Sequence, residues 1–332
     1  MNRDDVQTST ILDRVLVLEM VRVTEAAAIA ASNWIGRGDN DSADTAAVEA
    51  MRSELNKLPM NGTVVIGEGE RDEAPMLYIG EKVGSAQGGA PDIDIALDPL
   101  EGTTITAKGG PNALAVLAIA ESGCLLNAPD VYMEKLAVGP GYPEGTIDLD
   151  KPPADNIRAI ARTKGVEPNE IIACVLDRPR HQEIIAQLRE LGCGIQLIDD
   201  GDVAGVMATA DPDTSIDVYI GTGGAPEGVL AAAALRCVGG QIQGRLVFRS
   251  DDEIARARRW GIDDLERIYT ITDMARGDCI FAATGVTDGS LLQGVHRRKD
   301  CVTTESLVMR ASSGTVRRVR ADHYKFGSQR SL

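Results

Sequence analysis

The chain has 332 residues, of which 43% are hydrophobic and 25% are charged, a composition typical of a soluble globular protein long enough for two domains. Its formal net charge is −16, so we do not expect a general binder of nucleic acid or of anionic membranes. Six widely spaced cysteines, a polar N-terminus and the absence of an apolar run of about 18 residues predict a reduced, cytoplasmic protein without a membrane anchor.

The N-terminal part begins with two predicted helices. Apolar residues at helical spacing indicate the first helix over 11–35. The second covers 43–58, with Ser42 as a suitable N-cap. Asp44 falls in the first turn of this second helix, where an acid either complements the helix dipole or belongs to a functional site.

The stretch D-I-D-I-A-L-D-P-L-E-G-T, from Asp92, is the motif around which the chain is organised. Its alternation predicts a strand with one apolar face, and Pro99, which has no N–H group to donate, is expected to end it. The strand end and the turn after it then present Asp98, Glu101 and the hydroxyl of Thr103 together. This set suits a hard divalent cation, although a solvated Asp-Pro turn gives the same local pattern.

A second acidic cluster follows another predicted strand, over 63–66. The loop G-E-G-E-R-D-E-A-P starts at Gly67 and places four acids within six residues from Glu68. Glycine at this point lets the backbone bend closely around a small ion. Two acidic clusters at strand ends favour a metal site over two solvated loops.

The chain changes character after the Gly- and Pro-rich linker 139–155. The N-terminal part is completed by strands predicted over 76–83, 112–120 and 124–138. Beyond the linker we predict helices over 156–163, 181–191, 202–208 and 226–238 alternating with strands over 171–176, 195–198 and 216–220, then strands over 241–248, 279–284 and 303–320 around a helix over 251–260. The prediction is therefore an α/β protein with an α+β N-terminal part, 1–150, and a parallel α/β C-terminal part, 151–332.

The loops after the predicted parallel strands are the next candidates, because ligands bind outside the carboxyl ends of such strands. Arg178 and Arg180 flank a proline there and suit a phosphate, with a pair of surface arginines as the alternative. In D-G-D, Asp200 and Asp202 suit sugar hydroxyls, and Asp202 is also a plausible helix cap. The glycine-rich loop ending at Glu227 lacks a dinucleotide fingerprint, and Glu227 either complements a helix dipole or joins the acidic site.

Taken in order, these motifs resemble one family. They are D-T-A-A-V from Asp44, G-E-G-E-R-D-E-A-P-M-L-Y-I-G-E from Gly67, D-P-L-E-G-T from Asp98, N-A-P-D-V-Y-M-E-K-L from Asn127, R-P-R-H from Arg178, D-G-D from Asp200 and G-G-A-P-E-G from Gly223. Over nearly the whole chain this order is similar to the class II fructose-1,6-bisphosphatases of the GlpX type. D-P-L-E-G-T also resembles the signature of the wider lithium-sensitive phosphatase superfamily, which includes inositol monophosphatases. The resemblance implies a layered α-β-α-β-α sugar-phosphatase fold.

The resemblance also implies roles for individual residues. It implies Asp44 and Glu68 as ligands of one Mg²⁺ or Mn²⁺ ion, and Asp98, Glu101 and Glu227 as ligands of a second. The implied substrate contacts are Glu101, Gly102, Thr103, Tyr132, Arg178, Pro179, Arg180, Asp200, Gly201, Asp202 and Gly224. Asp72 and Thr103 match residues that help to activate the attacking water. The loop before Asp92 is slightly longer than the family pattern and the segment 248–252 is shorter, which bears on subunit contacts more than on chemistry.

The expected function is metal-dependent hydrolysis of the 1-phosphate of fructose 1,6-bisphosphate, in gluconeogenesis or the Calvin cycle. The partner is then a small sugar bisphosphate, and the resemblance implies a homodimer or homotetramer with an N-terminal metal-binding and a C-terminal substrate-binding domain. Three alternatives stay open: a dual enzyme that also accepts sedoheptulose 1,7-bisphosphate, an inositol-type monophosphatase, and a non-catalytic sugar-phosphate sensor.

Overall fold

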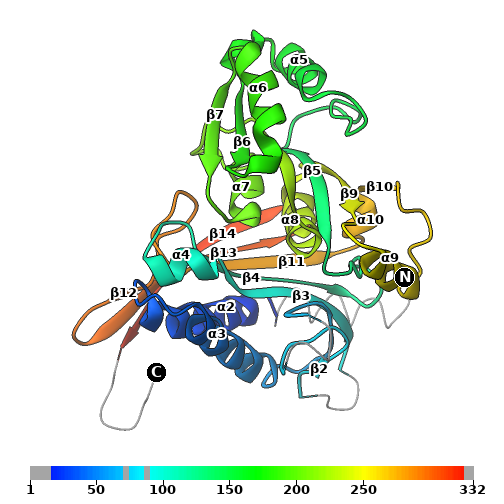
Figure 1. Ribbon diagram of the computed structural model, residues 1–332. Helices are drawn as coiled ribbons and strands as arrows, with labels where there is room; N and C mark the ends of the chain where they lie inside the picture. The colour runs from blue at the N-terminus through cyan, green and yellow to red at the C-terminus, as the bar shows by residue number, and fades with distance from the viewer. Residues whose placement is uncertain (1–15, 70–74, 86–89, 325–332) are drawn as a thin grey trace.

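The computed structural model describes residues 16–69, 75–85 and 90–324 (Figure 1). Within these residues the chain forms two β-sheets, each with helices packed on its faces. The predicted α/β class is therefore confirmed. No helix in this part of the chain is long and apolar enough to cross a membrane.

The first sheet is mixed and contains the motif strand. Its order is β12-β13-β11-β4-β3-β1-β2, with β14 paired to β13. The strands are β1 (Asn61–Ile66), β2 (Lys82–Val83), β3 (Asp92–Glu101), β4 (Leu114–Glu121), β11 (Cys279–Gly285), β12 (His296–Arg297), β13 (Cys301–Arg310) and β14 (Thr315–Tyr324). β3 pairs in parallel with β1 and antiparallel with β4, so it lies inside the sheet.

The second sheet has the order β10-β9-β5-β8-β6-β7. Its strands are β5 (Tyr132–Val138), β6 (Ile172–Leu176), β7 (Gly194–Ile198), β8 (Val218–Gly224), β9 (Gln241–Val247) and β10 (Ile268–Thr270). Only β6 pairs in parallel, with β7 and β8; the other pairs are antiparallel. The parallel pairing predicted for the strands 171–176, 195–198 and 216–220 is therefore confirmed for β6, β7 and β8. The sheet also contains antiparallel pairs, because β5 enters between β8 and β9 from the N-terminal part of the chain.

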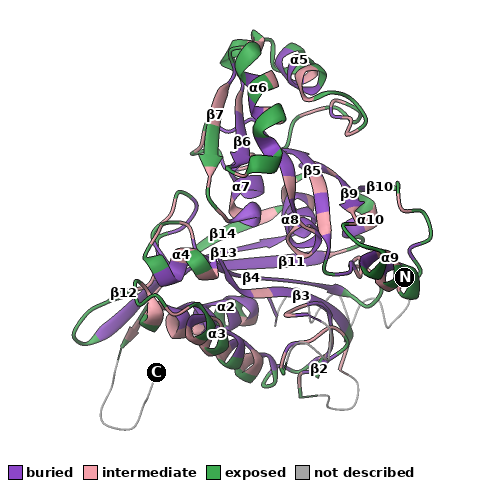
Figure 2. Ribbon diagram, in the orientation of Figure 1, coloured by how far each residue is buried: buried purple, intermediate pink, exposed green. Residues whose placement is uncertain are grey.

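Helices cover both sheets in three layers, which gives the expected α-β-α-β-α order. α2 (Val17–Ala31) and α3 (Asn40–Leu55) share a core with one face of the first sheet. α7 (Asp202–Ala208) and α8 (Ala225–Val238) lie between the sheets, and α5 (Pro153–Lys164) and α6 (Gln182–Glu190) cover the far face of the second. α8 is buried along most of its length (Figure 2), and its run of small alanines lets both sheets approach it.

Several local predictions were wrong for identifiable reasons. β3 continues through Pro99 to Glu101, because a register shift between Asp98 and Glu101 removes the need for the missing N–H group. The N-cap of α3 is Asp39, which accepts a hydrogen bond from the backbone of Ser42 over 3.0 Å, so the helix begins earlier than predicted. Residues 221–224 extend β8 instead of forming a loop.

Other differences are in length. The strand expected over 76–83 is reduced to β2, and the one expected over 124–138 to β5. The shorter elements not predicted are α4 (Thr103–Lys108), α10 (Ile271–Met274) and the 3₁₀ turns η2 (Ser32–Trp34), η3 (Pro168–Glu170) and η4 (Pro179–His181); α9 (Asp251–Arg259) agrees with the prediction. The predicted division near residue 150 stays a prediction, and strands from both sides of that point build the first sheet.

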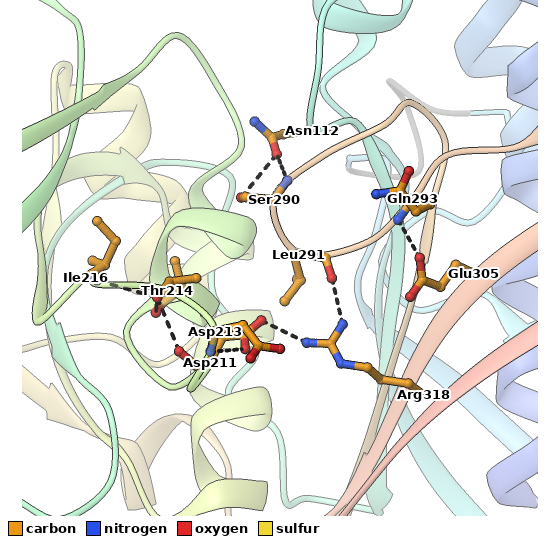
Figure 3. A network of polar contacts seen from close by, with 11 residues as sticks. Asn112, Asp211, Asp213, Thr214, Ile216, Ser290, Leu291, Gln293, Glu305 and Arg318 are labelled. Atoms are coloured by element: carbon orange, nitrogen blue, oxygen red, sulfur yellow. Dashed lines mark hydrogen bonds and ion pairs between the residues drawn. The ribbon is translucent and has the colours of Figure 1, made fainter.

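A polar network links β14 of the first sheet to the turn after α7 (Figure 3). Arg318, on β14 of the first sheet, donates to the Leu291 carbonyl over 2.7 Å and to Asp211 Oδ2 over 2.8 Å. Asp211 is buried in the turn after α7, which packs against the second sheet. The position of α7 relative to the first sheet is therefore fixed by a charge pair as well as by apolar packing.

Candidate active site

One cavity of about 440 Å³ collects the predicted site residues. Its lining includes Asp44, Glu68, Asp98, Glu101, Gly102, Thr103, Tyr132, Arg178, Arg180, Asp200, Asp202, Gly224 and Glu227. Pro179 and Gly201 do not line it but adjoin residues that do, and Asp72 lies outside the described residues. The lining residues come from positions 44 to 249 of the chain, and both sheets together with α3, α7 and α8 contribute to the cavity.

Carboxylates form one wall of the cavity. Burial, followed by repulsion from Glu68, Glu101 and Glu227, raises the pKa of Asp98 well above its usual value. Burial and the charge of Asp44 raise the pKa of Glu68 to about 8. The pKa values of Asp44, Glu101 and Glu227 are also raised, with burial as the largest cause in each. Such a cluster is short of positive charge.

Backbone groups orient two of these acids. The register shift in β3 turns Asp98 so that its Oδ1 accepts a hydrogen bond from the Leu100 N–H over 3.0 Å. Glu101 Oε1 accepts from the Val203 N–H over 2.6 Å, in the first turn of α7. Gly102 follows in the left-handed conformation, with φ of 93°, and starts α4 at Thr103. The motif therefore depends on a contact from the second half of the chain.

The donor set fits a hard divalent cation. Glu101 Oε2 and Glu227 Oε2 are buried and have no hydrogen-bond partner among the described residues, a costly arrangement unless a ligand completes it. Carboxylate oxygens are the preferred ligands of Mg²⁺ and similar ions. Among the described residues, no three Asp, Glu, His or Cys side chains lie close enough together to hold one ion as they stand.

Arginines face the cavity from the second sheet. Arg180 lies in η4 and donates from Nε and Nη2 to the Thr222 carbonyl, over 2.9 and 2.7 Å. His181 is buried and holds the same residue, because its Nε2 accepts the Thr222 N–H over 2.8 Å. Arg178 is close enough to Asp200 to lower that carboxyl's pKa, although burial, the larger effect, raises it.

Two glycines keep the carboxylates close to the backbone. A Cβ on Gly223 would lie 1.8 Å from Asp202 Oδ2, and one on Gly224 would lie 1.9 Å from Glu227 Oε2. Gly201 adopts the left-handed conformation, with φ of 90°, as the N-cap of α7. Glycine is therefore required at 223 and 224 by the close approach of a carboxylate, and at 201 by the left-handed backbone.

Two cationic residues of the site were not predicted. Lys135, fully buried on β5, donates to Asp202 and to the Gly224 carbonyl, the latter over 2.8 Å. Its signal was a lysine in the alternating pattern of an otherwise apolar strand face, beside Met133. Arg249 lines the cavity after β9, and nothing in its local sequence marks it.

Comparison with known proteins agrees with this geometry. The family model described as "Bacterial fructose-1,6-bisphosphatase, glpX-encoded" matches residues 14–323. The chain belongs to this family. Relatives of the glpX-type chain include "Fructose-1,6-bisphosphatase 1 class 2" of Escherichia coli K12 and "Fructose-1,6-bisphosphatase class 2" of Shigella flexneri, each 50% identical over 325 residues, covering 94% of this chain and 96% of the relative.

Two solved structures are more distant. They are an inositol monophosphatase from Anabaena, with 11% identity and a TM-score of 0.32 over 62% of this chain and 73% of that one, and the extragenic suppressor protein suhB from Bartonella henselae, with 16% identity and a TM-score of 0.32 over 59% and 73%. The glpX-type family assignment rests on the sequence matches. It makes the chain a phosphatase, and it implies use of a divalent metal ion.

Proposed function

We propose that this glpX-type enzyme hydrolyses the 1-phosphate of fructose 1,6-bisphosphate to give fructose 6-phosphate and phosphate. The observation that carries the proposal is the polarity of one cavity. Unpaired carboxylate oxygens of Glu101 and Glu227 lie on one wall, and the guanidinium groups of Arg178 and Arg180 face the same space. A substrate with a phosphate at each end of a sugar matches both features. The names of the 50% identical relatives support this substrate.

The carboxylate wall would hold the metal. We assign Asp44 and Glu68 to one ion, and Asp98, Glu101 and Glu227 to a second, with Mg²⁺ or Mn²⁺ as the ions. When bound, these ions supply positive charge beside the reacting phosphate and increase the acidity of bound water. Their oxygen-only donor set supports this choice over zinc, which favours nitrogen and sulfur ligands.

The protein groups position the substrate and water. Thr103 opens α4 at the cavity, so its hydroxyl can hold the attacking water. We assign activation of this water to Asp72 and Thr103 from the family resemblance, with Asp72, Glu70 and Thr103 as the candidates for the base. We assign the distal phosphate to Arg178 and Arg180 through charge-assisted hydrogen bonds. The remaining proposed substrate contacts are Glu101, Gly102, Tyr132, Pro179, Asp200, Gly201, Asp202 and Gly224. Attack is expected to be in line, without a phosphoenzyme.

The setting completes the proposal. All six cysteines are free, which supports a reducing, cytoplasmic location. We propose a homodimer or homotetramer, acting in gluconeogenesis or the Calvin cycle on a small sugar bisphosphate. The N-terminal part up to residue 150 would supply all of the assigned metal ligands except Glu227, and the part from 151 would supply most of the substrate contacts.

A dual enzyme that also hydrolyses sedoheptulose 1,7-bisphosphate is the second candidate. A neighbouring hollow of about 590 Å³ is lined by Arg178 and Asp200, which also line the first cavity. Arg178 and Asp200 thus border both hollows, and a seven-carbon sugar, which is longer than a six-carbon one, would reach toward the second. Lys108 also lines this hollow and would add a positive charge there.

The test is phosphate release from purified protein with Mg²⁺, with Mn²⁺ and with EDTA. The substrates are fructose 1,6-bisphosphate, fructose 1-phosphate and sedoheptulose 1,7-bisphosphate, with Asp98→Asn as the inactive control. Metal-dependent release of one phosphate from the fructose bisphosphate, with the monophosphate poor, supports the proposal. Equal rates on both bisphosphates make the enzyme dual. Folded protein that binds fructose 6-phosphate but releases no phosphate with any metal would instead be a sensor.

A further inference from the structure

The ring of Tyr132 carries two guanidinium groups. The Arg180 guanidinium carbon lies 4.9 Å from the ring centroid, and that of Arg249 lies 4.3 Å from it. All three side chains line the same cavity. Stacking on an aromatic face orients a guanidinium while leaving its edge available for hydrogen bonds.

Arg249 is also fixed from its other side. Its Nε and Nη2 donate to Glu253 Oε1 over 3.0 and 2.7 Å, and its backbone N–H donates to Glu253 Oε2 over 2.6 Å. Glu253 is buried in the first turn of α9, which Ser250 caps, so the helix start holds this carboxylate in place. The half-exposed Arg249 side chain is therefore oriented before any ligand arrives.

Both stacked arginines keep one nitrogen free of protein partners. Arg180 uses Nε and Nη2 on Thr222, and Arg249 uses Nε and Nη2 on Glu253. In the described part of the chain, neither Nη1 group has a hydrogen-bond acceptor. A cavity lined by eight acidic residues needs more than one or two cations to attract a dianionic phosphate, and the charge of Arg178 is partly offset by Asp200.

We propose that Arg249 binds the distal phosphate of the sugar bisphosphate, forming with Arg180 and Tyr132 a clamp that selects bisphosphates over monophosphates. This inference rests on the proposed function for the identity of its ligand. Arg249 is a specificity-determining residue and takes no part in breaking the phosphate ester at the acidic wall. Its removal should therefore weaken binding much more than it lowers turnover.

The chain offers a matched control. Arg267 lies over the ring of Tyr269, 4.8 Å from its centroid, and pairs with Asp273 over 2.7 Å, away from the cavity lining. Arg267→Met removes the same kind of stacked, paired arginine without touching the site. Arg249→Lys keeps a positive charge but loses the planar group, so it separates charge from geometry.

The experiment measures binding of fructose 6-phosphate, which retains the distal phosphate, by calorimetry, and KM and kcat for fructose 1,6-bisphosphate. We expect Arg249→Met to weaken fructose 6-phosphate binding and raise KM by roughly 10- to 100-fold, with kcat within about threefold of wild type. Arg249→Lys should recover part of the loss, and Arg267→Met should match wild type. Circular dichroism and melting temperature check that each variant is folded.

Arg249→Met with affinity and KM within about twofold of wild type overturns the inference. A fall in kcat with unchanged KM also overturns it, because the residue would then act at the other end of the substrate. If the wild-type protein binds fructose 6-phosphate but hydrolyses nothing, the proposed function fails, while the calorimetric comparison of wild type with Arg249→Met still tests the role of Arg249. If a variant loses its fold, Arg249→Lys carries the test.

Discussion

Lys135→Met should strongly destabilise the metal-free protein. The lysine side chain is fully buried, and it donates to Asp202 and to the Gly224 carbonyl. Methionine fills a similar volume but donates no hydrogen bond, so it leaves both acceptors in place without their partner. In the variant the Asp202 charge has no buried cation beside it but still lies near other carboxylates, because this charge contributes to the raised pKa of Glu101 and of Glu227.

The magnitude follows from burial. Removing one partner of a buried ion pair costs about 3–5 kcal/mol, because the other charge remains desolvated. The lost hydrogen bond to the Gly224 carbonyl adds about 1 kcal/mol. The whole effect is therefore about 4–6 kcal/mol, a large part of the stability of most domains.

Urea unfolding of the protein in EDTA, followed by circular dichroism, measures this loss. Lys164→Met is the matched control, because Lys164 pairs with Asp217 over 2.6 Å but is 43% exposed. Asp217 also keeps the Ile172 N–H, so this control should lose only about 0.5–1 kcal/mol. Adding Asp202→Asn to Lys135→Met should recover about 2–3 kcal/mol, since it removes the orphaned charge.

A loss below about 1 kcal/mol for Lys135→Met would refute this reasoning. It would mean that Asp202 sheds its charge or reaches water at little cost, and that the lysine is not what stabilises the acidic wall. Equal losses for Lys135→Met and Lys164→Met would refute it as well, because burial would then make no difference.

Three further predictions follow from single contacts. Gly224→Ala should lower kcat/KM by about 10- to 100-fold with a melting temperature close to wild type. The backbone angles of Gly224 suit alanine, but the added Cβ would displace the Glu227 side chain. Wild-type activity of the variant would contradict this prediction. Arg318→Met should lower the unfolding free energy by about 1–2 kcal/mol, measured in urea, through loss of the buried Asp211's partner; a change within error would show that the pair contributes nothing. His181→Gln should make the melting temperature fall less steeply with pH below pH 6.5. Burial lowers the pKa of His181, so the unfolded chain binds the proton more tightly and the stability present above pH 6.5 is lost as the pH falls. Parallel curves of melting temperature against pH for the two proteins would contradict this prediction.

The acidic motif could be found in the sequence because it is local. Alternation identified the strand, and Asp98 and Glu101 were correctly expected at its end. The role of Pro99 was misjudged, because a proline ends a regular ladder but is tolerated at a register shift. Whether a shift is present depends on how β4 pairs, and the motif alone contains no information about that.

Contacts between distant segments could not be predicted in this way. Lys135 meets Asp202, 67 residues further along, and Glu101 meets Val203, 102 residues further along. Hydrophobic periodicity assigns a face to each residue but does not say which polar group lies opposite it. The antiparallel position of β5 in the second sheet was missed for the same reason, since alternation of strands and helices describes neighbours along the chain.

The acidic wall depends on both halves of the chain. The first sheet supplies Asp98 and Glu101, but the N–H group that holds Glu101 comes from α7 and the buried cation comes from β5. Glu227 stands in the first turn of α8, where the helix dipole favours a negative charge. Neither sheet could stabilise this group of carboxylates alone, because each lacks the positive charge or the N–H donors that the other provides. Within the described part of the chain, the same arrangement leaves Glu101 Oε2 and Glu227 Oε2 without hydrogen-bond partners, and these are acceptors that we assign to the metal ion.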